Sequence, residues 1–389
     1  MDAVLNPFSP GAGSPPPELI GRSEVLEDAR VLIGRLKAGR SVQSLLLNGL
    51  RGVGKTVVLN EIRDMSRKQG ILPIKIEINE DETLAEQLVP LLKDTFFDLD
   101  RLAKAKDKIK KGIVALRNFM GTLKLRYGDF GIDIEPIPGL ADSGSLQHDL
   151  IALFRCVGEA AAEQSNAVLL LIDEIQCLPG KDLRALIMMA HEMQQERLPV
   201  AIVGAGLPIL PGLVGNVKTY AERLFLFPTV GALSEDEAMR AIRAPLSEGG
   251  VAIDDRALRL VAQESRGYPY FIQEWGYQLW NRAAGKPIQS KDVSALAEKV
   301  EARLDANFFR VRIERLTPGE RDFLKNMGKV GGPNVRMGEL AKAMRVKVTA
   351  LGPRRTSLIR KGMIYSPAYG EIAFTVPMFA EFLRRNPRI

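Results

Sequence analysis

The chain has few of the side chains that build disulfide frameworks or soft-metal sites. Its 389 residues include two cysteines and two histidines, at Cys156, Cys177, His148 and His191. The cysteines stand in no paired motif, and with only two histidines beside them there are too few soft ligands for a convincing zinc site. We therefore expect neither a disulfide framework nor histidine-based catalysis.

Long apolar runs are missing as well. A membrane helix needs about 20 consecutive apolar residues, and the richest stretch, "LPVAIVGAGLPILPGLVG", is interrupted by glycines and prolines. The opening residues "MDAVLNPFSPGAGSPPP" lack the basic start and the apolar centre of a secretory signal. These absences argue against a membrane partner and predict a cytoplasmic protein.

Acidic residues become scarce toward the C-terminus. The formal net charge is +7, but from Ala306 to Ile389 there are 17 Lys or Arg against 6 Asp or Glu. That segment has a net charge of +11, which leaves −4 for the first 305 residues. An acidic partner is therefore expected at the C-terminal end.

Hydrophobic periodicity predicts an α/β protein followed by a helical unit. Four apolar strands, "SLLLNG", "ILPIKIEIN", "NAVLLLID" and "LPVAIVGAG", alternate with helical patterns, which calls for a parallel sheet. Between the second and third strands lies a long insertion with a lysine-rich helix and a hairpin-like "LKLRYGDFGIDIEP". After Val230 the pattern is helical, beginning with a capping box at Ser234 and Glu237.

The stretch "NGLRGVGKTVVL", residues 48–59, fits the pattern Gly-x4-Gly-Lys-[Ser/Thr]. An apolar strand precedes it and a helix follows, which is the context that a phosphate-binding loop requires. Glycines let backbone N–H groups turn inward around the phosphates, Lys55 brings a charge to the β and γ phosphates, and the Thr56 hydroxyl is a Mg²⁺ ligand. The expected nucleotide-binding residues of the loop are Gly49, Leu50, Arg51, Gly52, Val53, Gly54, Lys55, Thr56 and Val57.

Two acids end the strand "VLLLIDE". Asp173 and Glu174 are expected at the carboxyl edge of the sheet, where ligands of open α/β sheets bind. Asp173 is expected to hold Mg²⁺ with Thr56, and Glu174 to activate the attacking water in phosphoryl transfer. Glu174 and Lys55 are therefore candidate catalytic residues.

These motifs, the N-terminal "LIGRSE" and the helical unit after the sheet resemble an AAA+ P-loop ATPase. The closer likeness is to the origin-recognition initiator type and its bacterial and archaeal ATPase relatives, which border the STAND signalling NTPases. The resemblance runs from about Leu19 to the C-terminus. It implies an α/β fold class with a parallel-sheet P-loop NTPase core, an α-helical lid and a C-terminal winged-helix domain.

This resemblance predicts four parts of the chain. Residues 1–18 form an extended lead-in, and residues 19–230 form the nucleotide-binding core with an insertion at about 81–148. Residues 231–305 form the helical lid, and residues 306–389 form the winged-helix domain.

Further site residues follow from the resemblance. Ile20, Gly21 and Arg22 match the family's segment that flanks the adenine. Arg223 matches the arginine that reaches the γ-phosphate of a neighbouring subunit, which implies a homo-oligomer built through the ATP interface. Asn79 resembles the polar residue that senses the γ-phosphate and restrains the catalytic glutamate. A surface ion pair for Arg223 and a turn role for Asn79 stay open as alternatives.

Two departures from the family pattern concern hydrolysis. Initiator-type enzymes have a polar sensor at the end of the fourth strand, where this chain has "GAGLP". In the lid they have a sensor arginine, where this chain has "RGYPYF", with Gly267 and Pro269 as in the GxP signature of STAND proteins. Pro269 is therefore expected at the nucleotide, and Arg266 is not assigned the sensor role. We expect slow hydrolysis rather than a fast motor.

The basic C-terminal segment predicts a helix, a turn, a second helix and a β-hairpin, which resembles a winged helix. A helix with so many cations fits the major groove, and each phosphate that it neutralises releases counterions. Arg354 and Ser357 are expected to reach base edges. The candidate DNA-contact residues are Lys347, Arg354, Arg355, Ser357, Arg360 and Lys361. Protein contacts or internal packing of the same domain remain the alternative.

The sequence thus predicts an ATP-binding AAA+ protein that uses ATP or ADP and Mg²⁺ and hydrolyses ATP slowly. ATP-dependent conformational change or assembly is expected to control binding of double-stranded DNA. The alternative is a STAND-like nucleotide switch whose winged helix mediates protein contacts. A small-molecule kinase would leave the lid and the winged helix unexplained.

Overall fold

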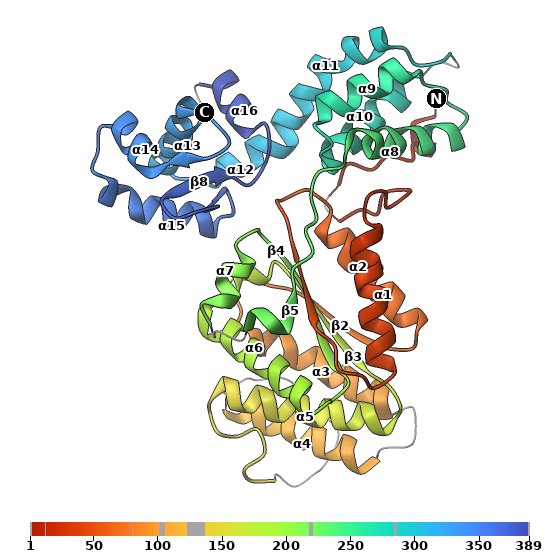
Figure 1. Ribbon diagram of the computed structural model, residues 1–389, viewed down its shortest axis with the longest axis vertical. Coiled ribbons are helices and arrows are strands. Elements are labelled where there is room, and N and C mark those ends of the chain that lie inside the picture. The colour runs from red at the N-terminus through yellow and green to blue at the C-terminus, as the bar shows by residue number, and fades with distance from the viewer. Residues whose placement is uncertain are drawn as a thin grey trace.

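The computed structural model describes residues 2–11, 13–79, 81–100, 106–122, 137–217, 221–283 and 286–387. The hairpin expected in "LKLRYGDFGIDIEP" lies outside these ranges. Within them, no helix combines the length and the apolar character that crossing a membrane requires. The chain forms an α/β core, a helical bundle at one end of it and a small C-terminal domain beside the bundle (Figure 1).

The core is built on a parallel sheet of five strands in the order β2-β3-β4-β1-β5. The four expected strands are present. β5 adds a fifth, which the sequence analysis missed because two residues are too few to show a period. Leu45 in β1 pairs with Val203 in β4 and with Leu226 in β5. The strands are β1 (Ser44–Asn48), β2 (Leu72–Glu77), β3 (Val168–Asp173), β4 (Val200–Gly206) and β5 (Phe225–Leu226).

Helices cover both faces of this sheet, so its strands are buried on both sides. Leu45 and Leu47 pack in the apolar cluster of α1 (Ser23–Lys37) and α2 (Lys55–Lys68). Leu46, between them, belongs to the opposite cluster. That cluster includes α3 (Leu84–Asp100), α5 (Leu146–Glu163) and α6 (Gly180–Gln195). The alternation fixes the strand register, since a slip of one residue would exchange the two faces.

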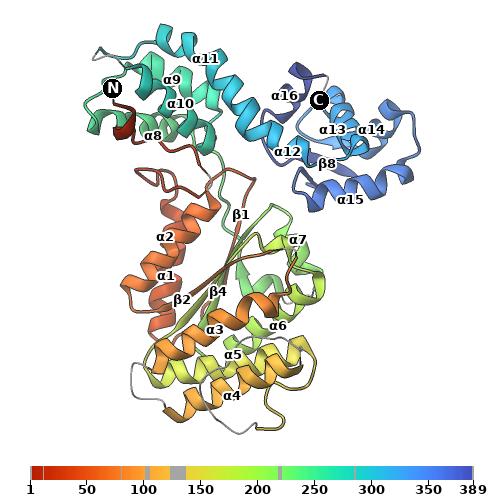
Figure 2. The ribbon, with the colours of Figure 1, turned by 180° about the vertical axis from the view of Figure 1, so that it is seen from behind.

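The insertion adds an outer layer to the core. Helix α4 (Lys106–Thr122) packs on α3 and α5 and lies farthest from the bundle (Figure 2). Lys108 Nζ lies 2.9 Å from Glu159 Oε2 of α5, and Lys111 Nζ lies 3.8 Å from the same oxygen. Part of the lysine-rich face is therefore engaged by the neighbouring helix.

The bundle, or lid, begins at the capping box expected from the sequence. The Ser234 hydroxyl accepts from Glu237 N, and the Glu237 carboxylate accepts from Ser234 N. The lid helices are α8 (Glu235–Glu248), α9 (Asp255–Ser265), α10 (Pro269–Arg282) and α11 (Ser290–Leu304).

The first residues of the chain pack against the lid. A short 3-10 turn, Ala3–Leu5, precedes Phe8, whose ring is buried against Gly276 of α10. Trp280 Nε1 donates to the carbonyl of Asp2 at 2.8 Å. These residues are thus packed against α10 of the lid.

The C-terminal domain consists of helices around a small antiparallel sheet of order β6-β8-β7. The hairpin expected in "IYSPAYGEIAFTVP" is present, since β7 and β8 pair with Ile364 opposite Phe374. A π-helical segment, Asp305–Arg310, leads from the lid into the domain. The other elements are α12 (Val311–Glu314), α13 (Pro318–Val330), β6 (Val335–Arg336), α14 (Met337–Met344), a 3-10 turn (Val348–Leu351), α15 (Gly352–Arg360), β7 (Ile364–Tyr365), β8 (Glu371–Phe374) and α16 (Phe379–Arg385).

An aromatic cluster joins the lid to the C-terminal domain. Phe308 in the π-helical segment lies 5.4 Å from Phe271 of α10, measured between ring centroids. Phe309, the next residue, lies 5.0 Å from Phe382 and 5.6 Å from Phe379, both in α16. Neighbouring side chains of this segment thus bind two different domains, which fixes the C-terminal domain beside the lid.

Candidate functional site

The phosphate-binding loop lies at the carboxyl end of β1, between the sheet and the lid. Gly54 has a φ of 93°, a left-handed conformation that turns the loop into the first residue of α2. Lys55 Nζ donates to the carbonyls of Gly49 and Leu50 at 2.9 and 2.8 Å. Burial lowers the pKa of Lys55 to about 8, although the nearby carboxylates act in the opposite direction. The amine is therefore held inside the loop, away from water.

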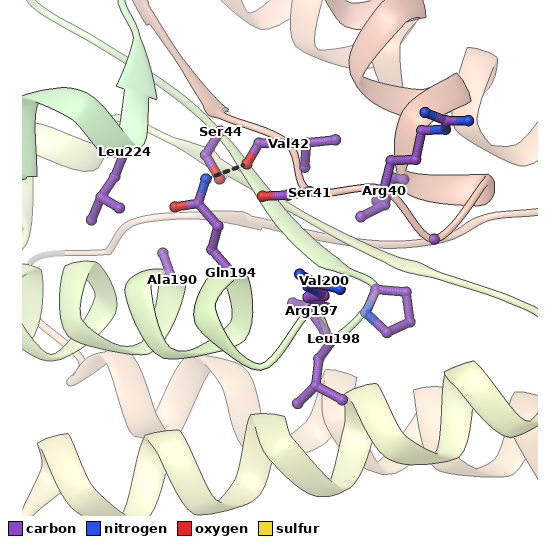
Figure 3. Close-up of a pocket in the computed structure, with 13 residues that line it drawn as sticks. Arg40, Ser41, Val42, Ser44, Ala190, Gln194, Arg197, Leu198, Val200 and Leu224 are labelled. Carbon is purple, nitrogen blue, oxygen red and sulfur yellow. Dashed lines mark hydrogen bonds between the residues drawn. The ribbon is translucent and has the colours of Figure 1, made fainter.

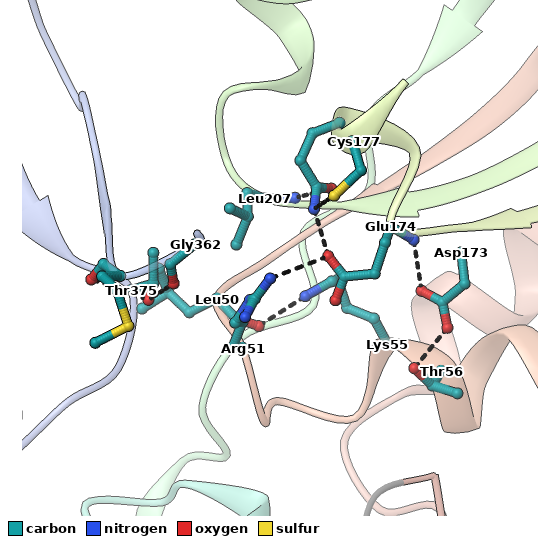
Figure 4. Close-up of polar contacts among 12 residues, drawn as sticks. Leu50, Arg51, Lys55, Thr56, Asp173, Glu174, Cys177, Leu207, Gly362 and Thr375 are labelled. Carbon is teal, nitrogen blue, oxygen red and sulfur yellow. Dashed lines mark hydrogen bonds and ion pairs between the residues drawn. The ribbon is translucent and has the colours of Figure 1, made fainter. Parts of the chain in front are cut away.

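The two acids meet the loop as the sequence analysis expected. Asp173 ends β3, and its Oδ2 accepts from the Thr56 hydroxyl at 2.6 Å (Figure 4). Its Oδ1 accepts from Glu174 N at 3.0 Å. A carboxylate and a hydroxyl that converge in this way supply the hard oxygen ligands that Mg²⁺ prefers. The donor set therefore fits the metal.

Glu174 follows in a left-handed backbone conformation, with a φ of 51°. Its Oε2 accepts from Gln176 Nε2 and lies 3.8 Å from Arg51 Nη2 (Figure 4). Both contacts fall on the same oxygen, so the other carboxylate oxygen is the one available to a water molecule.

A pocket of about 700 Å³ opens above the loop. This volume is within the range of nucleotide and cofactor sites. The sequence-predicted residues that line it are Ile20, Arg22, Arg51, Gly52, Val53, Gly54, Lys55, Thr56, Val57, Glu174 and Pro269. The structure therefore brings together the segment before α1, the loop, one of the two acids and the lid.

Arg22 ties three of these segments together. The residue is 6% exposed, and its guanidinium donates to the carbonyls of Val53 at 2.9 Å and of Gly231 at 2.7 Å. Burial lowers the pKa of Arg22, and Glu237 acts against this effect. Because it bonds backbone atoms on both sides, Arg22 fixes the loop to the chain that enters the lid.

Two predicted residues lie away from the pocket. Asn79 Oδ1 accepts from Asp81 N at 3.1 Å within its own turn. Arg223 is exposed just before β5, at the edge where the strands begin. The loop lies at the opposite edge, so Arg223 cannot reach the pocket of its own chain.

Several pocket residues were missed by the sequence analysis. They come from the lead-in, from α10 and from the helical connection to the C-terminal domain, and none belongs to a recognisable motif. The main ones are Ser9, Ser14, Glu18, Tyr270, Gln273, Asn307, Phe308, Arg312 and Arg315. Only the tertiary arrangement places them at the loop. Arg266, in contrast, turns away from the pocket and donates to Glu381 Oε1 at 2.9 Å.

A second cavity lies at the opposite edge of the sheet (Figure 3). It measures about 20 Å³ and is bordered by the segment before β1 and by the end of α6, where Gln194 Nε2 donates to Val42 O at 3.1 Å. That volume holds about one water molecule. It is too small for a nucleotide.

The candidate DNA-contact residues divide into two groups. Lys347, Arg354 and Arg360 are exposed. The other three are engaged within the domain: the Ser357 hydroxyl donates to Glu320 Oε1 at 2.6 Å, Lys361 Nζ donates to Glu320 Oε2 at 2.8 Å, and Arg355 donates to the Ser366 hydroxyl. Residues 345–350, called the basic turn here, are all exposed between α14 and α15.

A phosphate-binding loop after one parallel strand, an acid pair at the end of another and a lid over the pocket define a P-loop nucleoside triphosphatase. The sequence comparisons agree. Residues 18–203 match a family described as AAA ATPase domain, and this part of the chain is an AAA+ P-loop ATPase domain, as the sequence analysis expected. Residues 306–383 match a domain family of unknown function, DUF8462.

The chain is also similar to individual proteins. It is 20% identical over 358 residues to an uncharacterized HTH-type transcriptional regulator of Methanocaldococcus jannaschii, covering 90% of this chain and 84% of the relative. The Walker-type ATPase paby2304 of Pyrococcus abyssi superposes with a TM-score of 0.57 at 16% identity, over 94% of this chain and 96% of that one. This match supports the shared fold.

A third similarity is weaker. The Aeropyrum pernix Orc1 protein, solved in complex with DNA, gives a TM-score of 0.46 at 15% identity, over 96% of this chain and 94% of that one.

Proposed function

We propose that the protein is a slow ATPase of the initiator-like type, in which bound ATP controls contact between the C-terminal domain and double-stranded DNA. The observation that supports this is the composition of the pocket. Its lining extends from Lys55 of the core, through Pro269 of the lid, to Arg312 of the helix that enters the C-terminal domain. A ligand in this pocket would therefore contact the core, the lid and the helix that leads into the C-terminal domain.

Each residue then has a chemical role. Lys55 binds the β and γ phosphates, and Thr56 and Asp173 hold Mg²⁺, which neutralises charge on the phosphates. Glu174 accepts a proton from the water that attacks the γ-phosphorus, while the bond to the β–γ bridging oxygen breaks. Slow turnover fits the end of β4, where Gly206 and Leu207 provide no polar side chain.

Arg223 and Asn79 complete the proposed site. Because Arg223 is exposed at the far edge of the sheet, it would serve the pocket of a neighbouring copy, and the protein would assemble head to tail through the ATP interface. Asn79 would restrain Glu174, as its resemblance to the family's polar sensor implies.

For DNA binding we propose a winged helix formed by α13, α14, α15 and the β7–β8 hairpin. The element order supports this, and so do the exposed cations Arg345 and Lys347 of the basic turn with Arg354 and Arg360 of α15. Tyr369, at the hairpin tip, is fully exposed. Ser357 and Lys361 are held by Glu320 and are not part of this surface.

One observation favours the alternative, a nucleotide switch whose C-terminal domain binds protein. The domain packs against the core and the lid, since Arg51 N donates to Thr375 O at 3.3 Å and Arg266 pairs with Glu381. Internal packing of this kind is what a switch domain requires.

Fluorescence anisotropy of a labelled duplex tests the proposal. The Glu174→Gln variant should bind ATP without hydrolysing it, so we expect tighter DNA binding with ATP and Mg²⁺ than without, and weaker binding as salt rises. Lys347→Gln, added to the Glu174→Gln variant, should reduce the slope of log affinity against log salt concentration by about 0.9. This is the contribution of one phosphate contact. Lys299→Gln, which removes an exposed lysine from the lid, is the matched control. A duplex that is ignored at low salt with and without ATP would favour the switch.

A further inference from the structure

Two arginines from distant parts of the chain face the same pocket. Arg51 belongs to the phosphate-binding loop, and Arg312 lies on α12, which leads into the C-terminal domain. The Arg312 guanidinium lies 3.9 Å from the centroid of the Phe308 ring and donates to the Phe308 carbonyl. Burial lowers the pKa of Arg312, and the charge of Arg51 acts in the same direction.

Three carboxylates, those of Glu18, Glu77 and Glu174, line the same pocket. Glu174 lies 3.8 Å from Arg51, beyond hydrogen-bond distance. Within the described part of the chain, Arg51 Nε and the Tyr268 hydroxyl are buried and have no hydrogen-bond partner. Tyr268 is 2% exposed and packs against Gly52, the residue after Arg51. Buried donors of this kind are costly unless an acceptor reaches them.

Arg51 also touches the C-terminal domain. Its backbone N–H donates to Thr375 O at 3.3 Å, and its side chain lies against Gly362 (Figure 4). A Cβ on Gly362 would lie 2.4 Å from Arg51 Cζ, so a larger residue at this position would displace the Arg51 side chain. One side chain thus lies between the candidate catalytic glutamate and the domain that we propose for DNA.

We propose that Arg51 and Arg312 together bind the terminal phosphate of the nucleoside triphosphate within one chain, and that this contact couples the phosphate to the C-terminal domain. The inference rests on the proposed function and names the residues through which it is regulated. The terminal phosphate accepts hydrogen bonds from both guanidinium groups and draws Arg51 away from Oε2 of Glu174, which ends that ion pair. A diphosphate lacks the third phosphate, so it leaves both arginines and Glu174 as they are. Arg312 thereby supplies a phosphate-binding arginine, a role that Arg266 of the lid does not fill because it bonds Glu381.

Calorimetric titration of the full chain with Mg²⁺ and either ADP or a non-hydrolysable ATP analogue tests this inference. Arg312→Gln should weaken binding of the analogue about tenfold or more, and change ADP affinity much less, because only the triphosphate loses a charge-assisted contact. Arg51→Gln, on a different element, should show the same selectivity. Arg310→Gln, an exposed arginine two residues from Arg312, is the matched control.

Hydrogen exchange tests the coupling. In the wild type, the analogue should slow exchange across residues 362–376 more than ADP does, and Arg312→Gln should abolish that difference. The inference is overturned if both arginine variants lower the affinity for ADP and for the analogue by the same factor. It is also overturned if they lower neither affinity. A wild type that binds neither nucleotide overturns the proposed function itself.

Arg312→Lys covers the case in which Arg312→Gln does not fold. It keeps the charge but loses the planar fork, so an intermediate and still triphosphate-selective loss supports the inference. An unchanged ratio of analogue to ADP affinity overturns it.

Discussion

Lys55 is the residue whose chemistry depends most on the surrounding fold. The residue is 6% exposed, and burial lowers the pKa of its amine to about 8 against an ordinary 10.5. At neutral pH the Lys55 amine is therefore still mostly protonated. A polyphosphate favours the charged form, so binding should raise the pKa again and take up a proton from solution.

Nucleotide affinity should therefore fall as pH rises through about 8, where the free protein loses the Lys55 proton. The loss should approach tenfold per pH unit above that point, since each unit then requires uptake of one proton. Titration with the non-hydrolysable analogue between pH 7 and 9.5 measures this slope. In Lys55→Arg the guanidinium keeps its charge, so nucleotide affinity should depend much less on pH. The same slope as in the wild type would show that another group titrates.

At the residue scale, the sequence predicts only what a local motif specifies. Lys55, Thr56, Asp173 and Glu174 were identified because a strand–loop–helix pattern and a strand end determine where they lie. Arg312 has no such signal. It reaches the pocket because the π-helical segment buries Phe308 and Phe309 against different domains, and that packing is not encoded in the neighbouring residues.

At the scale of elements, α13 and α15 are joined by a buried carboxylate. Glu320, 4% exposed, accepts from Ser357 and Lys361 of the α15 region and from the backbone of Thr317. Burial alone would raise the pKa of Glu320, but these hydrogen bonds outweigh it and lower the pKa to about 2. Two of the residues expected to contact DNA thus hold the domain together. The sequence analysis counted the cations but could not locate their acidic partner.

Glu320→Gln should destabilise the C-terminal domain by about 2 kcal/mol at pH 7, the typical value of hydrogen bonds to a charged group. Because the folded-state pKa of Glu320 is depressed, its stabilisation is fully present above about pH 4.5 and is lost as pH falls toward 2. Urea denaturation at pH 7 and at pH 3 measures the loss of stability in the variant and its dependence on pH. Glu339→Gln, an exposed carboxylate on α14, should change neither. A Glu320 effect that does not shrink at pH 3 would count against the charge-based explanation.

At the scale of the whole molecule, the pocket is assembled from segments that lie far apart in the chain. Alternating strands and helices predicted the core, because each of those elements has its own periodicity. The lead-in has none, and its role emerges only when Phe8 inserts beside Gly276 and the following residues line the pocket.

Phe8→Ala should therefore reduce both stability and nucleotide affinity. Removing a buried phenyl ring costs about 3 kcal/mol or more, and loosening the lead-in should also disturb Ser9 and Ser14 at the pocket. Thermal unfolding without ligand measures the loss of stability, and the shift in unfolding temperature on adding ADP and Mg²⁺ reports the nucleotide affinity. Val4→Ala, in the same segment but 89% exposed, should behave as wild type. Loss of stability with unchanged ADP affinity would show that the lead-in serves the lid alone.

Arg223 lies where the strands begin, and the pocket lies where they end. On the proposed assignment of Arg223, copies that join through this contact form a row with two unlike ends. One terminal copy presents a pocket that receives no arginine, and the other presents an arginine that meets no pocket. An open row therefore always has one complete site fewer than it has copies, and only closure into a ring removes the deficit.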